Sequence, residues 1–172
     1  FRVALLQQAA RMWRTAVAGM GLQAMIPASP AAADAPHRPR SIASLNLCTD
    51  QLLLMLADPE TIIGLSALAQ DCTNAPLCQQ ARHFPVLRPS AEALLSLRPD
   101  LVLGEGYTAQ SALMAARSVG ARVELFDPVQ SLAQIPEQIL RMGTLLGVPE
   151  RAQALARAFN DRLAQLTAPS GE

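Results

Sequence analysis

The sequence of 172 residues contains no lysine, and all 14 of its basic residues are arginines. Schiff-base chemistry and the lysine of a phosphate-binding P-loop are therefore both excluded. The arginines are balanced by 14 acidic residues, which gives a formal net charge of zero. Because the chain has no basic excess with which to hold a phosphate backbone, we expect no nucleic-acid partner.

Motifs of hydrolases and of metal sites are also missing. The sequence has no G-x-S-x-G, no H-E-x-x-H and no C-x-x-C, and its two histidines, His37 and His83, lack partners at ligand spacing. Cys48 has no histidine placed to activate it as a nucleophile. We therefore expect a protein that is not an enzyme and that holds no metal or cofactor of its own.

What is present begins with an N-terminal export signal. Arg11 and Arg14 precede an uncharged, largely apolar stretch at 15–26, and small residues at 31–35 offer a cleavage site. This pattern predicts that residues 1–35 comprise upstream sequence and a signal peptide, and that the mature chain begins near Pro36 in the periplasm; an uncleaved membrane anchor is the alternative. Export permits disulfides, and the spacing of Cys72 and Cys78 suits a small closed ring.

From residue 41 onward, strand and helix patterns alternate, which indicates an α/β domain with a parallel sheet covered by helices. Thr49 and Ser90 are the expected N-caps of the first two helices. A long loop at 66–89 interrupts the alternation. The predicted strands are 42–47, 61–65, 101–103 and 122–126, and the predicted helices are 50–57, 91–97 and 109–118.

Two consecutive helices are predicted at the end of the chain. Ser131 and Gln134 form a capping-box pair ahead of the first, which Gly147 ends. Pro149 suits the first turn of the second helix, 149–166, whose apolar residues recur at helical spacing.

In open α/β sheets, ligands bind outside the carboxyl ends of the strands. The residues expected there carry hydroxyls, a thiol and a tyrosine but few charges, which favours a bulky, partly apolar ligand. The candidate ligand-binding residues are Cys48, Thr49, Ser66, Leu68, Glu105, Tyr107 and Thr108.

Three segments together resemble a known family. They are RSIASLNLCTD at 40–50, IIGLS at 62–66 and EALLSLRPDLVL at 92–103, of which the last is the most specific. This order resembles the N-terminal lobe of the periplasmic substrate-binding proteins of ABC importers, in the subgroup that carries ferric siderophores, haem or cobalamin. The resemblance covers about residues 40–166.

The resemblance implies a three-layer α/β sandwich with a mainly parallel central sheet, which is the Rossmann-like lobe of a class III periplasmic binding protein. Residues 36–148 would form this lobe, 149–166 the helix that connects two lobes, and 167–172 a truncated tail with the C-terminal lobe absent. The implied partners are a small metal chelate or corrinoid, which brings its own iron or cobalt, and an inner-membrane ABC permease; a monomer is expected. Glu92 matches the carboxylate that docks on the permease, although an acidic residue in a first helical turn is also favourable by itself.

One further pattern predicts a different function. Gly104, Gly106 and Ala109 fit the G-x-G-x-x-G/A fingerprint between a strand and a helix, and Glu124 or Asp127 follows at the distance of a ribose-binding acid. The alternative is therefore a dinucleotide-binding oxidoreductase. The export signal argues against it, as does the position of the motif after the third predicted strand, because the fingerprint normally follows the first.

Overall fold

A parallel sheet of five strands forms the centre of the computed structural model, which describes residues 38–167. The export signal predicted within 1–35 lies outside the described residues, as does the predicted tail at 167–172 except for Thr167, which belongs to the last helix. Every strand pair is parallel, and the strand order is β3-β2-β1-β4-β5. The strands are β1 (Ile42–Ser44), β2 (Ile62–Ser66), β3 (Val86–Leu87), β4 (Leu101–Gly104) and β5 (Arg122–Leu125).

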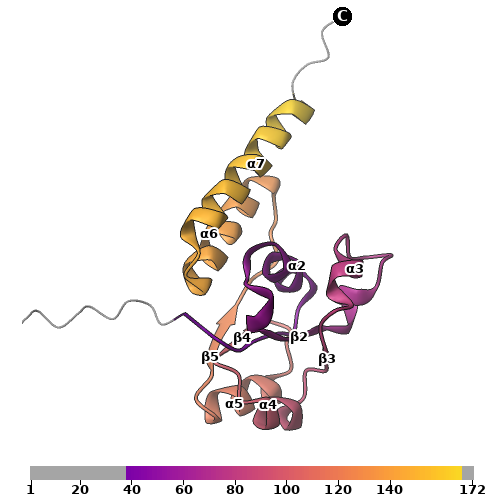
Figure 1. Cartoon of the computed structure of the whole chain (residues 1–172), viewed down its shortest axis with the longest axis vertical. Helices are drawn as coiled ribbons and strands as arrows, with labels where there is room; N and C mark the ends of the chain where they lie inside the picture. Colours follow the sequence, from indigo (N-terminus) through magenta and orange to yellow (C-terminus); the bar gives the residue numbers. More distant parts are fainter. Residues whose placement is uncertain (1–37, 168–172) are drawn as a thin grey trace, which may run out of the picture. The chain divides into compact units, whose positions relative to one another are not determined.

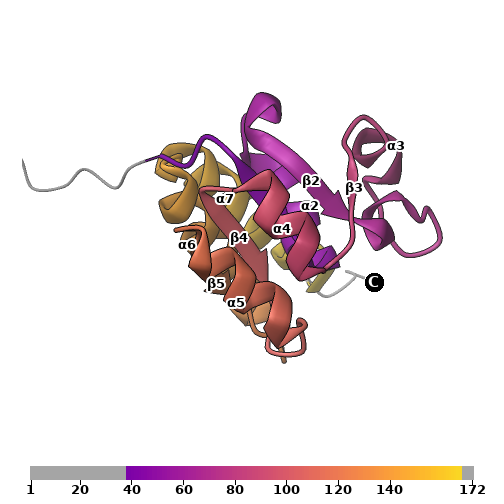
Figure 2. The same cartoon turned by 90° about the horizontal axis from the view of Figure 1, so that it is seen from below.

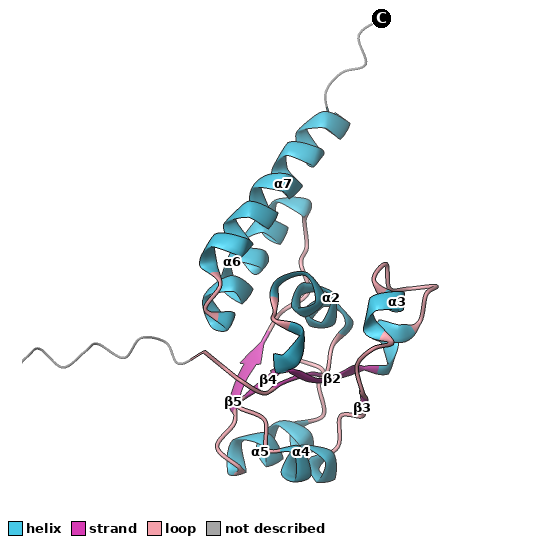
Figure 3. Cartoon of the chain, viewed as in Figure 1, coloured by secondary structure: helices cyan, strands magenta, loops and turns pink. Residues whose placement is uncertain are grey.

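Helices cover both faces of this sheet, as Figures 1 and 3 show. Successive side chains of a strand point to opposite faces. Ile42 and Leu101 therefore pack in a core with α2 (Leu47–Leu56) and α6 (Ile135–Leu146), whereas Ala43 and Val102 pack with α4 (Ala91–Leu97) and α5 (Gln110–Ser118). This arrangement confirms the three-layer α/β fold.

The direction of winding reverses beside β1. From β1 the chain moves outward to β2 and β3, and it then crosses back to place β4 on the other side of β1. Figure 2 shows α4 and α5, the helices before and after β4, side by side on one face of the sheet. A reversal of this kind separates the loops after β1 and β4, and it opens a crevice at the carboxyl edge of the sheet.

Local signals placed several helix ends correctly. The Ser90 hydroxyl accepts a hydrogen bond from the Ala93 N–H at 3.2 Å and begins α4, as expected. Gly147 ends α6 with a φ of +68°, a left-handed conformation that costs glycine little.

Two predicted caps are wrong. Helix α2 begins at Leu47, and its cap is Asn46, whose side-chain oxygen accepts from the N–H groups of Cys48 and Thr49. Ser131 makes no capping hydrogen bond, because a short 3-10 turn, η3 (Leu132–Gln134), precedes α6.

The predicted long loop is ordered into short elements. It contains the 3-10 turn η2 (Ala67–Gln70), the one-turn helix α3 (Cys78–Ala81) and the edge strand β3, which sequence analysis missed. A disulfide joins Cys72 to Cys78, and Cys48 is a free thiol. A further 3-10 turn, η1 (Pro59–Thr61), leads into β2.

The described part of the chain closes with a pair of helices, α6 and α7 (Pro149–Thr167). They approach closely where Gly143 of α6 meets Ala152 of α7. Ala152 and Ala156 are buried, whereas Leu166 near the end of α7 is 67% exposed. Among the described residues no helix combines the length and the apolar character that crossing a membrane requires.

Candidate functional site

A cavity of about 250 Å³ opens at the carboxyl edge of the sheet, beside the point where the winding reverses. Four parts of the chain form it: the start of α2, the end of β4, the loop after β5 and the first turns of α6. Its walls are mostly apolar. The lining residues are Asn46, Cys48, Gln51, Leu52, Glu105, Phe126, Asp127, Pro128, Val129, Ile135 and Gln138.

The first turn of α2 is held rigidly at the cavity. The Asn46 side-chain oxygen accepts hydrogen bonds from the N–H groups of Cys48 at 2.7 Å and Thr49 at 3.1 Å. Cys48 lies in this turn with its side chain exposed. Partial burial raises the pKa of the Cys48 thiol, and the nearby carboxylates of Glu105 and Asp50 raise it further. The thiol is therefore protonated at neutral pH, and its nucleophilicity is low.

Two side-chain amides in the cavity wall are incompletely paired. Gln51 Oε1 accepts from the Leu77 N–H at 3.1 Å, which fixes the orientation of that amide. Within residues 38–167, the buried Gln51 Nε2 and Gln138 Oε1 have no hydrogen-bond partner. A buried polar atom without a partner costs about 1–3 kcal/mol. A molecule that pairs with this donor and this acceptor would remove the cost.

The charges at the cavity are negative. Glu105 and Asp127 belong to the lining, which includes no arginine or histidine. The described part of the chain has no group of three His, Cys, Asp or Glu side chains able to hold a metal ion. The described cavity therefore combines mostly apolar walls with two acidic side chains and two amides.

The predicted ligand-binding residues separate into three groups. Cys48 and Glu105 line the cavity. Leu68 and Tyr107 are 53% and 87% exposed on neighbouring loops at the same edge. The other three residues are buried, and their hydroxyls form hydrogen bonds within the protein. The Thr49 hydroxyl bonds to the Ser44 hydroxyl and the Asn46 carbonyl, and the Ser66 hydroxyl donates to Asp50. The Thr108 hydroxyl accepts from the Glu105 N–H. Direct ligand contact by these three stays a prediction.

The dinucleotide alternative is not favoured. Its first glycine, Gly104, is the last residue of β4, and the Thr108 hydroxyl lies 2.9 Å from the point that a Cβ on Gly104 would occupy. Glu124, one of the two candidate ribose-binding acids, forms ion pairs with Arg122 and Arg141. Its carboxylate is therefore occupied by two cations.

Sequence reasoning missed several lining residues. Gln51 lies one helical turn after Cys48, so the spacing within α2 could have indicated it. Ile135 and Gln138 share one face of α6 in the same way, but nothing in the sequence places that face beside α2.

The chain is similar to known proteins both in sequence and in structure. The sequence model of a family described as periplasmic binding protein matches residues 42–171. A cobalamin-binding protein of Halobacterium salinarum is 28% identical over 131 residues, which cover 74% of this chain and 35% of that protein.

Solved structures share the fold. A periplasmic haem-binding protein from Pseudomonas aeruginosa superposes with a TM-score of 0.62 at 23% identity, over 74% of this chain and 45% of that one. The periplasmic vitamin B12-binding protein of Vibrio cholerae gives a TM-score of 0.56 at 20% identity, over 74% and 49% respectively. The chain thus spans about a third of its curated relative and less than half of each of these solved chains.

Proposed function

Because the chain belongs to the periplasmic binding protein family, we propose that it forms a ligand-binding lobe of the solute-binding component of an ABC importer. The observation that carries this proposal is the apolar cavity at the carboxyl edge of the sheet, beside the reversal between β1 and β4. Ligands of doubly wound sheets bind at that position. The lobe would capture a solute and deliver it to a membrane permease without making or breaking covalent bonds.

The cavity favours a corrinoid over haem or an anionic ferric siderophore. Its two charged lining residues, Glu105 and Asp127, are acidic, so carboxylates of a ligand would find no cation there. Gln51 and Gln138 line the cavity, and their buried, unpaired Nε2 and Oε1 would supply one donor and one acceptor to a ligand that reaches them. Corrinoids carry neutral carboxamides that can pair with both, whereas the propionates of haem only accept. The cobalamin-binding relative from Halobacterium salinarum supports the same class.

The wider organisation is part of the proposal. The greater length of the relatives supports a second lobe opposite the cavity, reached through α7. Closure of two lobes around a solute would add contacts from both sides. Residues 1–35 would supply the export signal, and the disulfide between Cys72 and Cys78 suits an oxidising compartment.

The test is titration calorimetry of the purified full-length protein that contains this chain. Cyanocobalamin, hemin and a ferric catecholate siderophore are titrated in parallel, with NAD as a fourth compound. We expect saturable binding of cyanocobalamin, with hemin and the siderophore weaker. Binding of hemin alone would overturn the corrinoid assignment but keep the family role. No binding of the three metal compounds, together with binding of NAD, would overturn the proposal.

A pair of matched variants locates the site. Val129 lines the cavity and is 42% exposed, whereas Val86 is 48% exposed on the edge strand β3, outside the lining. Val129→Glu adds a charge that the ligand would have to desolvate, so we expect affinity to fall by about tenfold or more. Val86→Glu should leave affinity unchanged. Equal effects of the two variants would mean that the ligand binds elsewhere.

A further inference from the structure

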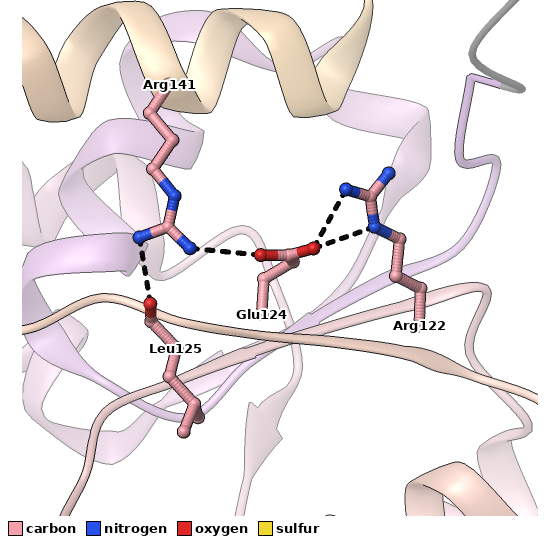
Figure 4. Close-up of polar contacts among 4 residues, drawn as sticks. All are labelled: Arg122, Glu124, Leu125 and Arg141. Carbon is pink, nitrogen blue, oxygen red and sulfur yellow. Dashed lines mark hydrogen bonds and ion pairs between the residues drawn. The ribbon is translucent and has the colours of Figure 1, made fainter.

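Arg141 of α6 connects its helix to the end of β5 through three contacts. One guanidinium nitrogen donates to the Leu125 carbonyl oxygen at 2.9 Å, and another lies 3.0 Å from Glu124 Oε2. The guanidinium carbon stands 4.3 Å from the centre of the Phe126 ring. Figure 4 shows Arg141 reaching both Leu125 and Glu124, with Arg122 holding the other oxygen of the Glu124 carboxylate.

These contacts lie directly behind the wall of the cavity. Phe126 is 5% exposed and lines the cavity from the end of β5. Gln138 lines it from α6, one helical turn before Arg141. Arg141 therefore links the cavity wall formed by α6 to the wall formed by Phe126 after β5.

We propose that Arg141 is a positioning residue for ligand binding, which holds the Phe126 ring and the first turns of α6 at the spacing the ligand needs. The inference rests on the proposed function, because it concerns the same cavity. Arg141 acts through Phe126 and is not itself among the lining residues.

The chemistry of the side chain explains why arginine is needed. The ion pair with Glu124 is partly exposed and would contribute little alone, since the Arg141 side chain keeps 39% of its surface in solvent. A planar guanidinium, however, can donate to a carbonyl, pair with a carboxylate and stack on a ring at the same time. A lysine ammonium retains the charge but lacks the planar fork. Arg141→Lys should therefore be intermediate between wild type and Arg141→Met.

The first arm of the test needs no ligand. The full-length protein is labelled with 4-fluorophenylalanine, and the ¹⁹F signal of Phe126 is assigned with Phe126→Leu. We expect Arg141→Met to shift or broaden the Phe126 signal while the others stay in place. The control is Arg117→Met, which removes an exposed arginine of α5 on the opposite face of the sheet. An unchanged Phe126 signal in Arg141→Met overturns the inference, whatever the protein binds.

The second arm measures cyanocobalamin and hemin affinity in a double-mutant cycle. We expect Arg141→Met to weaken binding about tenfold, equivalent to roughly 1.4 kcal/mol. In the Phe126→Leu background the same change should have less than about a twofold effect, because the two residues act as a unit. An equal loss in both backgrounds overturns the proposed route through Phe126. If wild type binds neither compound, the corrinoid assignment fails, and the ¹⁹F arm still decides whether Arg141 positions the ring.

Discussion

Asp50 is a carboxylic acid with no exposed surface, located in α2 behind the first turn of the cavity wall. Asp50 Oδ2 accepts a hydrogen bond from the Ser66 hydroxyl at 2.5 Å, and Asp50 Oδ1 accepts one from the Ser66 N–H at 3.2 Å. Burial raises the pKa of Asp50, and the hydrogen bonds from the hydroxyls of Ser44 and Ser66 oppose this shift in part. Asp50 thus links α2 to the end of β2 through hydrogen bonds, but its burial makes the charged carboxylate less favourable.

This cost predicts a specific pH dependence. Because the folded pKa of Asp50 lies above the ordinary value of 3.8, the native state binds a proton more tightly than the unfolded chain. The contribution of Asp50 to the free energy of unfolding is therefore greatest below pH 3.8 and falls as the pH rises through the folded pKa. Asp50→Asn should remove that fall, measured by urea unfolding across acidic to neutral pH.

Asp100 provides a control, because its pKa is shifted in the opposite direction from that of Asp50. Its carboxylate accepts from the N–H groups of Arg40 and Ser41 at 2.8 and 3.0 Å, and the hydrogen bond from Arg40 is the main cause of its lowered pKa. Its stabilisation is present above pH 3.8 and is lost as the pH falls through the folded pKa. Asp100→Asn should therefore flatten the acidic limb of the curve. Parallel curves for wild type and Asp50→Asn would contradict the assignment to Asp50.

At the scale of elements, the contact between α6 and α7 depends on one glycine. A Cβ on Gly143 would lie 2.1 Å from the Cβ of Ala152, which is fully buried. The helices can approach this closely only because Gly143 has no side chain. Gly143 thus allows a close contact in the middle of a helix, where glycine is otherwise unfavourable.

Gly143→Ala should lower the free energy of unfolding by about 1–3 kcal/mol, because overpacking outweighs the better helix propensity of alanine. Gly106→Ala is the matched control, since no atom lies within 4 Å of its added Cβ and its φ is not positive. It should change stability by less than about 0.5 kcal/mol. Urea unfolding measures both. A Gly143→Ala protein as stable as wild type would show that the helix pair can separate without cost.

At the scale of the whole molecule, the cavity and Glu92 share one edge. Helix α4 follows β3 directly, so its first turn, which contains Glu92, begins at the carboxyl end of the sheet. Glu92 is exposed there. The family resemblance implies a docking role for Glu92, and we propose that this carboxylate contacts a cationic surface of a permease while the ligand is held.

Glu92→Arg in the full-length protein should therefore abolish most ligand uptake by cells and leave the Kd of the purified protein unchanged. The control is Glu60→Arg, an exposed residue of η1 that precedes β2 and so lies at the opposite edge. It should affect neither uptake nor binding. A weaker Kd for Glu92→Arg would place Glu92 in the binding site, and normal uptake would remove it from docking.

Much of the fold was predictable because its signals are local. Alternation of strand and helix patterns indicated the layers, and Ser90 and Gly147 marked helix ends through hydrogen bonding and backbone conformation that involve only near neighbours. Strand β3 was missed because two residues carry too little pattern, and it exists only by pairing with β2.

The sequence by itself determined the fold class and the family, and it predicted the edge of the sheet at which we propose that a ligand binds. Tertiary structure decided which side chains reach that edge. Thr49 and Ser66 have the expected types and positions, yet packing buries their hydroxyls. Phe126 and Gln138 come from separate elements and line one cavity, and Arg141 of α6 contacts both the Leu125 carbonyl and the Phe126 ring. Side-chain periodicity follows from local backbone geometry, whereas the walls of a cavity depend on contacts between elements that the chain brings together only on folding.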